Sequence, residues 1–310
     1  MNKRIIIAGP TASGKSSLAV ETARLMNGEI ISADSRQCYR QINIGTAKPT
    51  PAQLDAIPHY NISILDLDEE DSAQNFYERC LHWIDKIEEK GKTPITAGGS
   101  TLHLQSLIRP FDDLPSSSEE NIKKLNRDQK EKGTGYLYER LKEVDPEYAR
   151  KMDGQNHQRI IRALDVWMQT GKPFSSFHSN REFEKPDQYA IFALYWPRKL
   201  LHQRIEKRCD EMLESGLVEE TKELLEAGYS KELQSLQTVG YRQVIQFLNG
   251  EIDREQMEKD FKTATRRYAK RQITWLRRWP FVTWLDANKQ DTEKLALMIQ
   301  DQVAADANNR

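Results

Sequence analysis

The chain has 310 residues, of which 38% are hydrophobic and 30% are charged, and its formal net charge at pH 7 is −1. This length predicts about two domains, or one domain with a large insertion, and the composition is typical of a soluble globular protein. No run of about 18 apolar residues occurs, and the three cysteines are far apart, which excludes a membrane-spanning helix, a disulfide framework and a cysteine-based zinc site.

The N-terminal segment is expected to be a buried strand. Residues 5–8 follow two basic residues and are apolar, as in a secretion signal, but this run is shorter than the ~7 residues that a signal core needs. Because a phosphate-loop pattern follows directly and the cysteines are unpaired in sequence, we expect a cytoplasmic protein.

Short apolar segments bounded by turn residues predict six strands. They are residues 4–8, 29–32, 60–64, 94–97, 190–196 and 281–285. Helical patterns at 16–26 and 73–90 lie between the early segments. Strands that alternate with helices indicate an α/β fold with a largely parallel sheet, covered on both faces.

The strand signal disappears in the middle of the chain. Helical patterns at 119–132 and 157–170 replace it, and the second pattern is followed by Gly171 and Pro173. We therefore expect a P-loop core formed by residues 1–114 and 187–310, with an inserted all-helical domain at residues 115–186. The chain after Pro197 is again mostly helical, which predicts a helical C-terminal region.

A glycine-rich loop joins the first predicted strand to the first predicted helix. Its residues are Gly9, Pro10, Thr11, Ala12, Ser13, Gly14, Lys15 and Ser16, which match the pattern G-x-x-x-x-G-K-S. In this context the backbone N–H groups surround phosphate oxygens, Lys15 adds a positive charge, and the Ser16 hydroxyl can bind Mg²⁺. The loop by itself requires only a diphosphate.

A GTPase and a small-molecule kinase are alternative interpretations of this loop. A GTPase is disfavoured because no D-x-x-G tetrapeptide occurs, although residues 288–291 imitate the guanine-reading N-K-x-D motif. A kinase stays open, since residues 62–66 could form a strand that ends in a magnesium-supporting carboxylate, Asp66.

Polar residues follow the second and fourth predicted strands. Because the carboxyl ends of parallel strands border the ligand crevice, Asp34 is expected to face the ligand of the phosphate loop. The alternative is that Asp34 only caps the next helix. Gly98 and Gly99 precede Ser100, whose hydroxyl is expected in the same crevice.

Residues 262–279 contain seven Lys or Arg and no Asp or Glu. On a helix, six of these cations fall within about 140° of arc; they are Arg266, Arg267, Lys270, Arg271, Arg277 and Arg278. This face predicts contact with a polyanion. Arg159 and Arg162 lie one helical turn apart and could bind neighbouring phosphates, whereas Gly240 could serve either backbone recognition or helix capping.

Six motifs in order resemble those of the tRNA dimethylallyltransferases, also called tRNA isopentenyltransferases. They are GPTASGKS (9–16), DSRQCYR (34–40), IGTAKP (44–49), QRIIRAL (158–164), TVGYR (238–242) and TRRYAKRQITWLR (265–277), and they span most of the chain. The resemblance implies an enzyme that moves a dimethylallyl group from dimethylallyl diphosphate to N6 of the adenosine 3′ of a tRNA anticodon, position 37. A relative that prenylates free AMP, ADP or ATP is the alternative within this resemblance.

The resemblance also implies roles for individual residues. The loop would hold the diphosphate with Mg²⁺ as cofactor, Asp34 would act as the base with Ser100 beside it, and residues Asp34, Ser35, Arg36 and Gln37 would read the target base. Contacts to the anticodon stem-loop are implied for Gln158, Arg159, Arg162, Gly240, Tyr241, Arg242, Lys270, Arg271, Gln272 and Arg277. We expect a monomer that binds tRNA and dimethylallyl diphosphate and no membrane.

The chain departs from the family pattern at three points. Where the family usually has G-G-T-x-L-Y, this sequence has Ser100 in place of the threonine and His103 in place of the tyrosine. The usual Asn-Asp before the Q-R pair is Gln155-Asn156 here. The zinc finger that some eukaryotic relatives add at the C-terminus is excluded by the cysteine count.

Overall fold

The computed structural model describes residues 3–109, 114–152, 154, 156–177 and 186–308. The chain forms two compact units, Met1–Arg109 together with Lys185–Arg310, and Pro110–Glu184. The sequence placed the corresponding junctions at 114/115 and 186/187. Among the described residues, no helix has both the length and the apolar character needed to cross a membrane.

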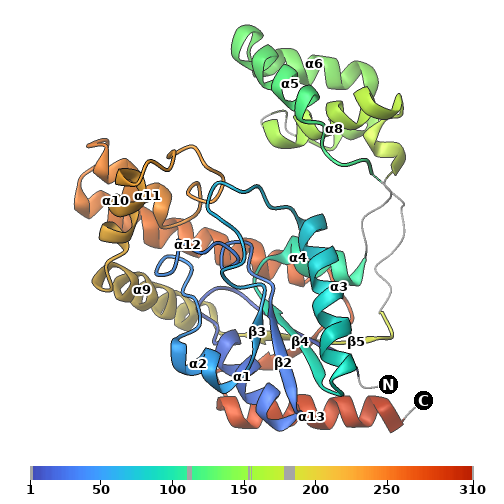
Figure 1. Ribbon diagram of the computed structural model, residues 1–310, viewed down its shortest axis with the longest axis vertical. Helices are drawn as coiled ribbons and strands as arrows, with labels where there is room; N and C mark the ends of the chain where they lie inside the picture. The colour runs from blue at the N-terminus through green and yellow to red at the C-terminus, as the bar shows by residue number, and fades with distance from the viewer. Residues whose placement is uncertain (1–2, 110–113, 153, 155, 178–185, 309–310) are drawn as a thin grey trace. The chain divides into compact units, whose positions relative to one another are not determined.

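The larger unit is built on a six-stranded sheet in which every neighbouring pair of strands is parallel (Figure 1). Its order is β3 (His59–Tyr60), β2 (Gly28–Ser32), β4 (Thr93–Gly98), β1 (Arg4–Ala8), β5 (Tyr189–Tyr195) and β6 (Thr283–Asp286). The predicted α/β class with a parallel sheet is therefore confirmed.

Helices cover both faces of this sheet. On one face, α1 (Lys15–Leu25) and α13 (Thr292–Asn308) pack against Ile5, Ile30 and Ile95 in one apolar core. On the other face, α3 (Ala73–Glu89) contacts β2 and β4 and packs against α4 (Thr101–Ile108). The alternation of side chains along β4 explains this arrangement, since Ile95 belongs to the first core and Thr96 lies beside Cys80 of α3.

A second apolar core lies beyond the carboxyl ends of the strands. It joins Tyr39 and Ile42 to residues of α9 (Arg198–Glu214), α10 (Leu217–Glu226), α11 (Tyr241–Leu248) and α12 (Arg254–Leu276). The short helix α2 (Pro51–Ala56) lies within the segment that leads to β3. The helical C-terminal region is thus placed at the edge of the sheet where a ligand crevice is expected.

All the regular secondary structure in the described part of the smaller unit is helical. It contains α5 (Glu119–Lys132), α6 (Thr134–Val144), α7 (Pro146–Arg150), α8 (His157–Thr170) and the 3₁₀ helix η1 (Phe174–Phe177). Leu125, Leu137, Leu141, Ile160 and Leu164 form its core. The unit therefore has its own hydrophobic centre.

The strand predicted at 60–64 is largely wrong. β3 contains only His59 and Tyr60, because Asn61 and Ser63 adopt left-handed backbone conformations, with φ of 60° and 52°. The Asn61 side chain donates to Ser32 O at 2.8 Å and accepts from Arg79, so polar contacts hold this bend in place.

Candidate active site

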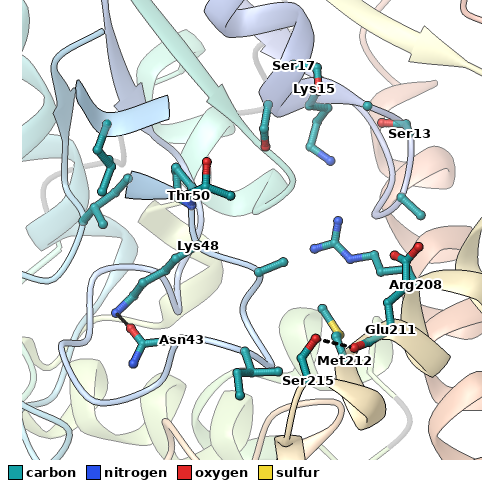
Figure 2. A pocket seen from close by; sticks show the side chains of 18 of the residues that line it. Ser13, Lys15, Ser17, Asn43, Lys48, Thr50, Arg208, Glu211, Met212 and Ser215 are labelled. Carbon is teal, nitrogen blue, oxygen red and sulfur yellow. Dashed lines mark hydrogen bonds between the residues drawn. The ribbon is translucent and has the colours of Figure 1, made fainter. Parts of the chain in front are cut away.

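The phosphate loop connects β1 to α1 and opens into a large cavity of about 940 Å³. Gly14 is the N-cap of α1 with φ of 96°, a conformation that favours glycine. The Lys15 Nζ donates to Pro10 O at 2.8 Å. Figure 2 shows the Lys15 ammonium and the Arg208 guanidinium pointing into the same space. Positive charge and the N-terminus of α1 therefore meet at this cavity.

The pKa of Lys15 is unusually low for a lysine. Burial and the charge of Arg208 lower this pKa to about 7, and the carboxylate of Asp34 opposes the shift. A bound anion would favour the charged ammonium in the same way, so the site is suited to a negatively charged ligand.

Asp34 follows β2 at the carboxyl edge of the sheet. Its Oδ1 accepts from the backbone N–H of Arg36 at 2.9 Å and of Gln37 at 3.4 Å, so Asp34 does cap the following turn. The described residues make no hydrogen bond to Oδ2. β2 and β4 approach closely here, since a Cβ on Gly98 would lie 2.1 Å from Ala33 O. Asp34 can therefore cap the turn with one oxygen and face the crevice with the other.

Three cavities share their walls in this crevice. A cavity of about 80 Å³ is lined by Lys15, Asp34 and Arg208, and it shares Lys15 and Arg208 with the large cavity. A third cavity of about 200 Å³ shares Asp34, Arg208 and Tyr268 with the small one. The three cavities thus adjoin one another, from the phosphate loop past Asp34 to the space beside Tyr268.

Ser100 connects the end of β4 to the Asp34 turn. Its Oγ accepts from Ser35 N at 2.9 Å, and Tyr268 forms a side-chain hydrogen bond with it. Burial raises the pKa of Tyr268 to about 12, and Asp34 adds to the effect, so the phenol stays protonated at neutral pH. Ser100 therefore positions its neighbours; the catalytic role expected for it stays a prediction.

The predicted base-reading residues differ in their surroundings. Arg36 lines the third cavity, and its Nε donates to Thr238 Oγ1 at 3.1 Å. Gln37 is buried, and its Nε2 donates to Thr46 O and Ala47 O, each at 3.1 Å. The Gln37 amide thus holds the 44–47 loop in place.

The TVGYR segment makes its strongest contacts inside the protein. Gly240 N donates to Gln243 Oε1 at 2.9 Å at the start of α11. Of the two roles considered for Gly240, this contact is helix capping. The fully buried Tyr241 hydroxyl bonds Glu220 and accepts from Gly45 N. Only Arg242 of the three predicted residues is exposed. The segment therefore supports the 44–47 loop, and the RNA contact expected for Arg242 stays a prediction.

The basic face of α12 is smaller than the sequence suggested. Of the six cations assigned to this face, Arg266 pairs with Glu206 of α9 at 2.7 Å. Lys262, one of the seven basic residues of the segment but outside this face, pairs with Asp210 of α9 at 2.5 Å. The remaining exposed cations are Arg267, Lys270, Arg271, Arg277 and Arg278. Gln272 lies on the opposite, buried side of the helix.

In the smaller unit, the two predicted arginines of α8 have different environments. Arg159 and Gln158 are exposed. Arg162 instead pairs with the fully buried Asp165 at 2.8 Å and donates to Pro115 O. Arg162 therefore links the segment before α5 to α8, and the RNA contacts expected for Gln158, Arg159 and Arg162 stay predictions. Gln155 lies outside the described residues.

The sequence reasoning missed Arg208 and did not assign Tyr268 to the site. Arg208 lines all three cavities, and Tyr268 lines the two that contain Asp34. The spacing of Arg204 and Arg208, one turn apart on a helix that follows a strand, was the available signal. His103 lies outside this lining: it is buried and stacks on Phe76 with ring centroids 4.4 Å apart, and burial lowers its pKa to about 4.

The parallel sheet, the phosphate loop and the crevice at the strand ends define a phosphate-binding α/β protein of the P-loop type. The sequence matches the family described as IPP transferase over residues 37–279, and the chain belongs to this family.

Relatives and solved structures agree with this assignment. The tRNA dimethylallyltransferase of Caldanaerobacter subterraneus subsp. tengcongensis is 45% identical over 287 residues, covering 90% of each chain, and that of Carboxydothermus hydrogenoformans is 42% identical over 296 residues, covering 94% of each. The crystal structure of the tRNA isopentenylpyrophosphate transferase from Bacillus halodurans has a TM-score of 0.74 at 34% identity and covers 100% of this chain and 98% of that one. A eukaryotic dimethylallyltransferase acting on tRNA has a TM-score of 0.78 at 29% identity, covering 93% and 74%.

Proposed function

We propose that the protein transfers a dimethylallyl group from dimethylallyl diphosphate to N6 of the adenosine at position 37 of tRNA and releases diphosphate. The observation that carries this proposal is the small cavity between the phosphate loop and the third cavity. Lys15 and Asp34 both line it, so an anion on the loop and a base near Asp34 would meet there. The names of the relatives support the same activity.

The residues of the crevice account for each part of such a transfer. The N6 lone pair forms a bond to C1 of the dimethylallyl group while the C1–O bond breaks and its electron pair leaves with the diphosphate. Asp34 Oδ2 takes the N6 proton, because the adenine amine is a weak nucleophile until that proton departs. Lys15, Arg208 and the loop N–H groups stabilise the negative charge that grows on the leaving group.

The donor groups fit Mg²⁺ bound together with a diphosphate. No cluster of three or more His, Cys, Asp or Glu that could hold a metal exists in the described part of the chain. Mg²⁺ commonly takes one or two protein oxygens, several waters and substrate phosphate oxygens, and the Ser16 hydroxyl lines both the large and the small cavity. Ser16 would hold the ion, which would neutralise charge on the diphosphate.

The exposed cations are suited to an RNA partner. Lys270 and Arg271 on α12, Arg277 directly after it, and Arg159 on α8 present positive charge for the anticodon stem-loop. The target adenine would leave the base stack to reach Asp34. We further propose a cytoplasmic monomer, in keeping with three free and buried cysteines.

Two other activities remain to be separated by experiment. A prenyltransferase for free AMP, ADP or ATP would use the same crevice but needs no exposed cations for RNA. A small-molecule kinase is disfavoured, because Asp66 pairs with the exposed Arg40 at 2.9 Å and, in the described part of the structure, lines none of the three cavities.

One assay distinguishes these activities. Dimethylallyl diphosphate is offered with unmodified tRNA or with free AMP, and prenylated product and diphosphate release are both measured. We expect product on tRNA alone. Product on AMP would refute the tRNA assignment, and a lack of prenylated product on either acceptor would favour the kinase.

A further inference from the structure

Gln272 bridges the phosphate loop and the end of β4 from the buried side of α12. Its Oε1 accepts from Thr11 N at 2.9 Å, and its Nε2 donates to Gly99 O at 2.7 Å. The residue is 3% exposed. A Cβ at position 99 would lie 2.3 Å from Nε2, so the bridge also requires glycine there. Both ends of the amide are thus satisfied within the protein.

Two other side chains hold the next two residues of the loop. Arg204 Nε donates to Ala12 O at 2.8 Å, and Trp196 Nε1 donates to Ser13 O at 2.9 Å. Arg204 also lies over the Trp196 ring, 4.3 Å from its centroid. Ala12 has φ of 62°, a conformation that costs free energy for a residue other than glycine. External contacts at three consecutive residues therefore stabilise a loop shape that its own backbone disfavours.

We propose that Gln272 is a positioning residue for the diphosphate rather than a contact to RNA. A phosphate loop binds its ligand through backbone N–H groups, so the direction of each N–H determines affinity. Gln272 and Thr11 both line the small cavity, and their hydrogen bond fixes the start of the loop at the cavity wall. The remaining loop N–H groups and Lys15 are thereby aimed at the anion.

The position of Gln272 on α12 supports this assignment. Lys270 and Arg271, its neighbours in sequence, are exposed, whereas Tyr268, one turn earlier, lines the crevice with Asp34. One helix therefore presents cations outward and supports the phosphate loop inward. Because the loop is assigned to a diphosphate, this role of Gln272 rests on the proposed function.

The test measures binding of two separate ligands to the full chain. Gln272→Met keeps the side-chain length but removes both hydrogen bonds, and Gln272→Asn keeps the amide but is too short to span Thr11 and Gly99. Gln302→Met, at an exposed glutamine of α13, is the matched control. Inorganic diphosphate with Mg²⁺, and an anticodon stem-loop RNA, are titrated against each protein by calorimetry, and thermal melting confirms folding.

We expect both Gln272 variants to bind diphosphate at least ~10-fold more weakly than wild type, because a buried N–H and a buried carbonyl lose their partners. The RNA affinity of these variants, and both affinities of the Gln302→Met control, should stay within about twofold of wild type. KM for dimethylallyl diphosphate should rise while KM for tRNA does not. Wild-type diphosphate affinity in either folded variant, or an equal loss of RNA affinity, would overturn the proposal. Absence of diphosphate binding by the wild-type protein would instead refute the assigned function of the loop.

Discussion

Substitution of Asp34 by Asn and by Ala separates its two roles. Oδ1 accepts two backbone N–H groups, at 2.9 and 3.4 Å, and Asp34 lines the small cavity. Asparagine keeps an oxygen for the turn but cannot take the N6 proton. Alanine removes the turn contacts as well, so the two variants should differ in stability more than in catalysis.

The magnitudes follow from these contacts. Loss of a general base lowers the rate by about 10²- to 10⁴-fold, so both variants should turn over at least ~100-fold more slowly, a cost of about 2.7 kcal/mol in the transition state. Asp34→Ala should also lose about 1 kcal/mol of folding free energy, the usual effect of removing a capping side chain. Asp34→Asn should melt close to wild type.

Single-turnover kinetics give the direct measurement. Enzyme in excess over tRNA is mixed with saturating dimethylallyl diphosphate, and prenylated RNA is followed with time, while thermal melting reports stability. A near wild-type single-turnover rate in Asp34→Asn would show that Asp34 is not the base. Equal melting temperatures for the two variants would show that the turn does not depend on Oδ1.

Two further predictions concern the charges of the site. Because the pKa of Lys15 is lowered to about 7, its ammonium loses its proton as the pH rises. Wild type should therefore bind diphosphate more tightly than Lys15→Met, and this difference in affinity should shrink between about pH 6 and pH 8. A difference that calorimetry finds constant over this range would contradict the lowered pKa. Lys270→Ala should weaken tRNA binding and reduce the slope of log affinity against log salt by about 1, whereas Lys294→Ala on α13 should leave it unchanged; an unaltered slope for Lys270→Ala would exclude a phosphate contact.

Elements with local signals were predictable to the residue. α5 spans 119–132 and α8 spans 157–170, as expected, because their N-caps Ser118 and Asn156 accept backbone N–H groups three residues later. The phosphate loop was equally clear, since glycine positions and a following helix are local properties of the chain. The order of strands in the sheet was not accessible in this way, because it depends on pairing between distant segments.

Errors arose where a distant residue supplies the partner of a side chain. The 60–64 strand failed because contacts to Ser32 and Arg79 stabilise a bend there. The basic face of residues 266–278 was overestimated by one cation, because the acid that neutralises Arg266 belongs to α9. A projection of one helix contains no information about the charges on another helix.

The amino-acid sequence by itself determined the phosphate loop, the alternation of strands and helices, and the helices at 119–132 and 157–170, because each depends on neighbours within a few residues. Only the tertiary structure decided that Arg208 and Tyr268 line the crevice, that Arg162 pairs with Asp165, and that Gln272 turns inward to the loop. The physical reason is that hydrogen bonds and ion pairs form between groups that folding brings together, and the free energy of burial selects which face of each helix turns inward.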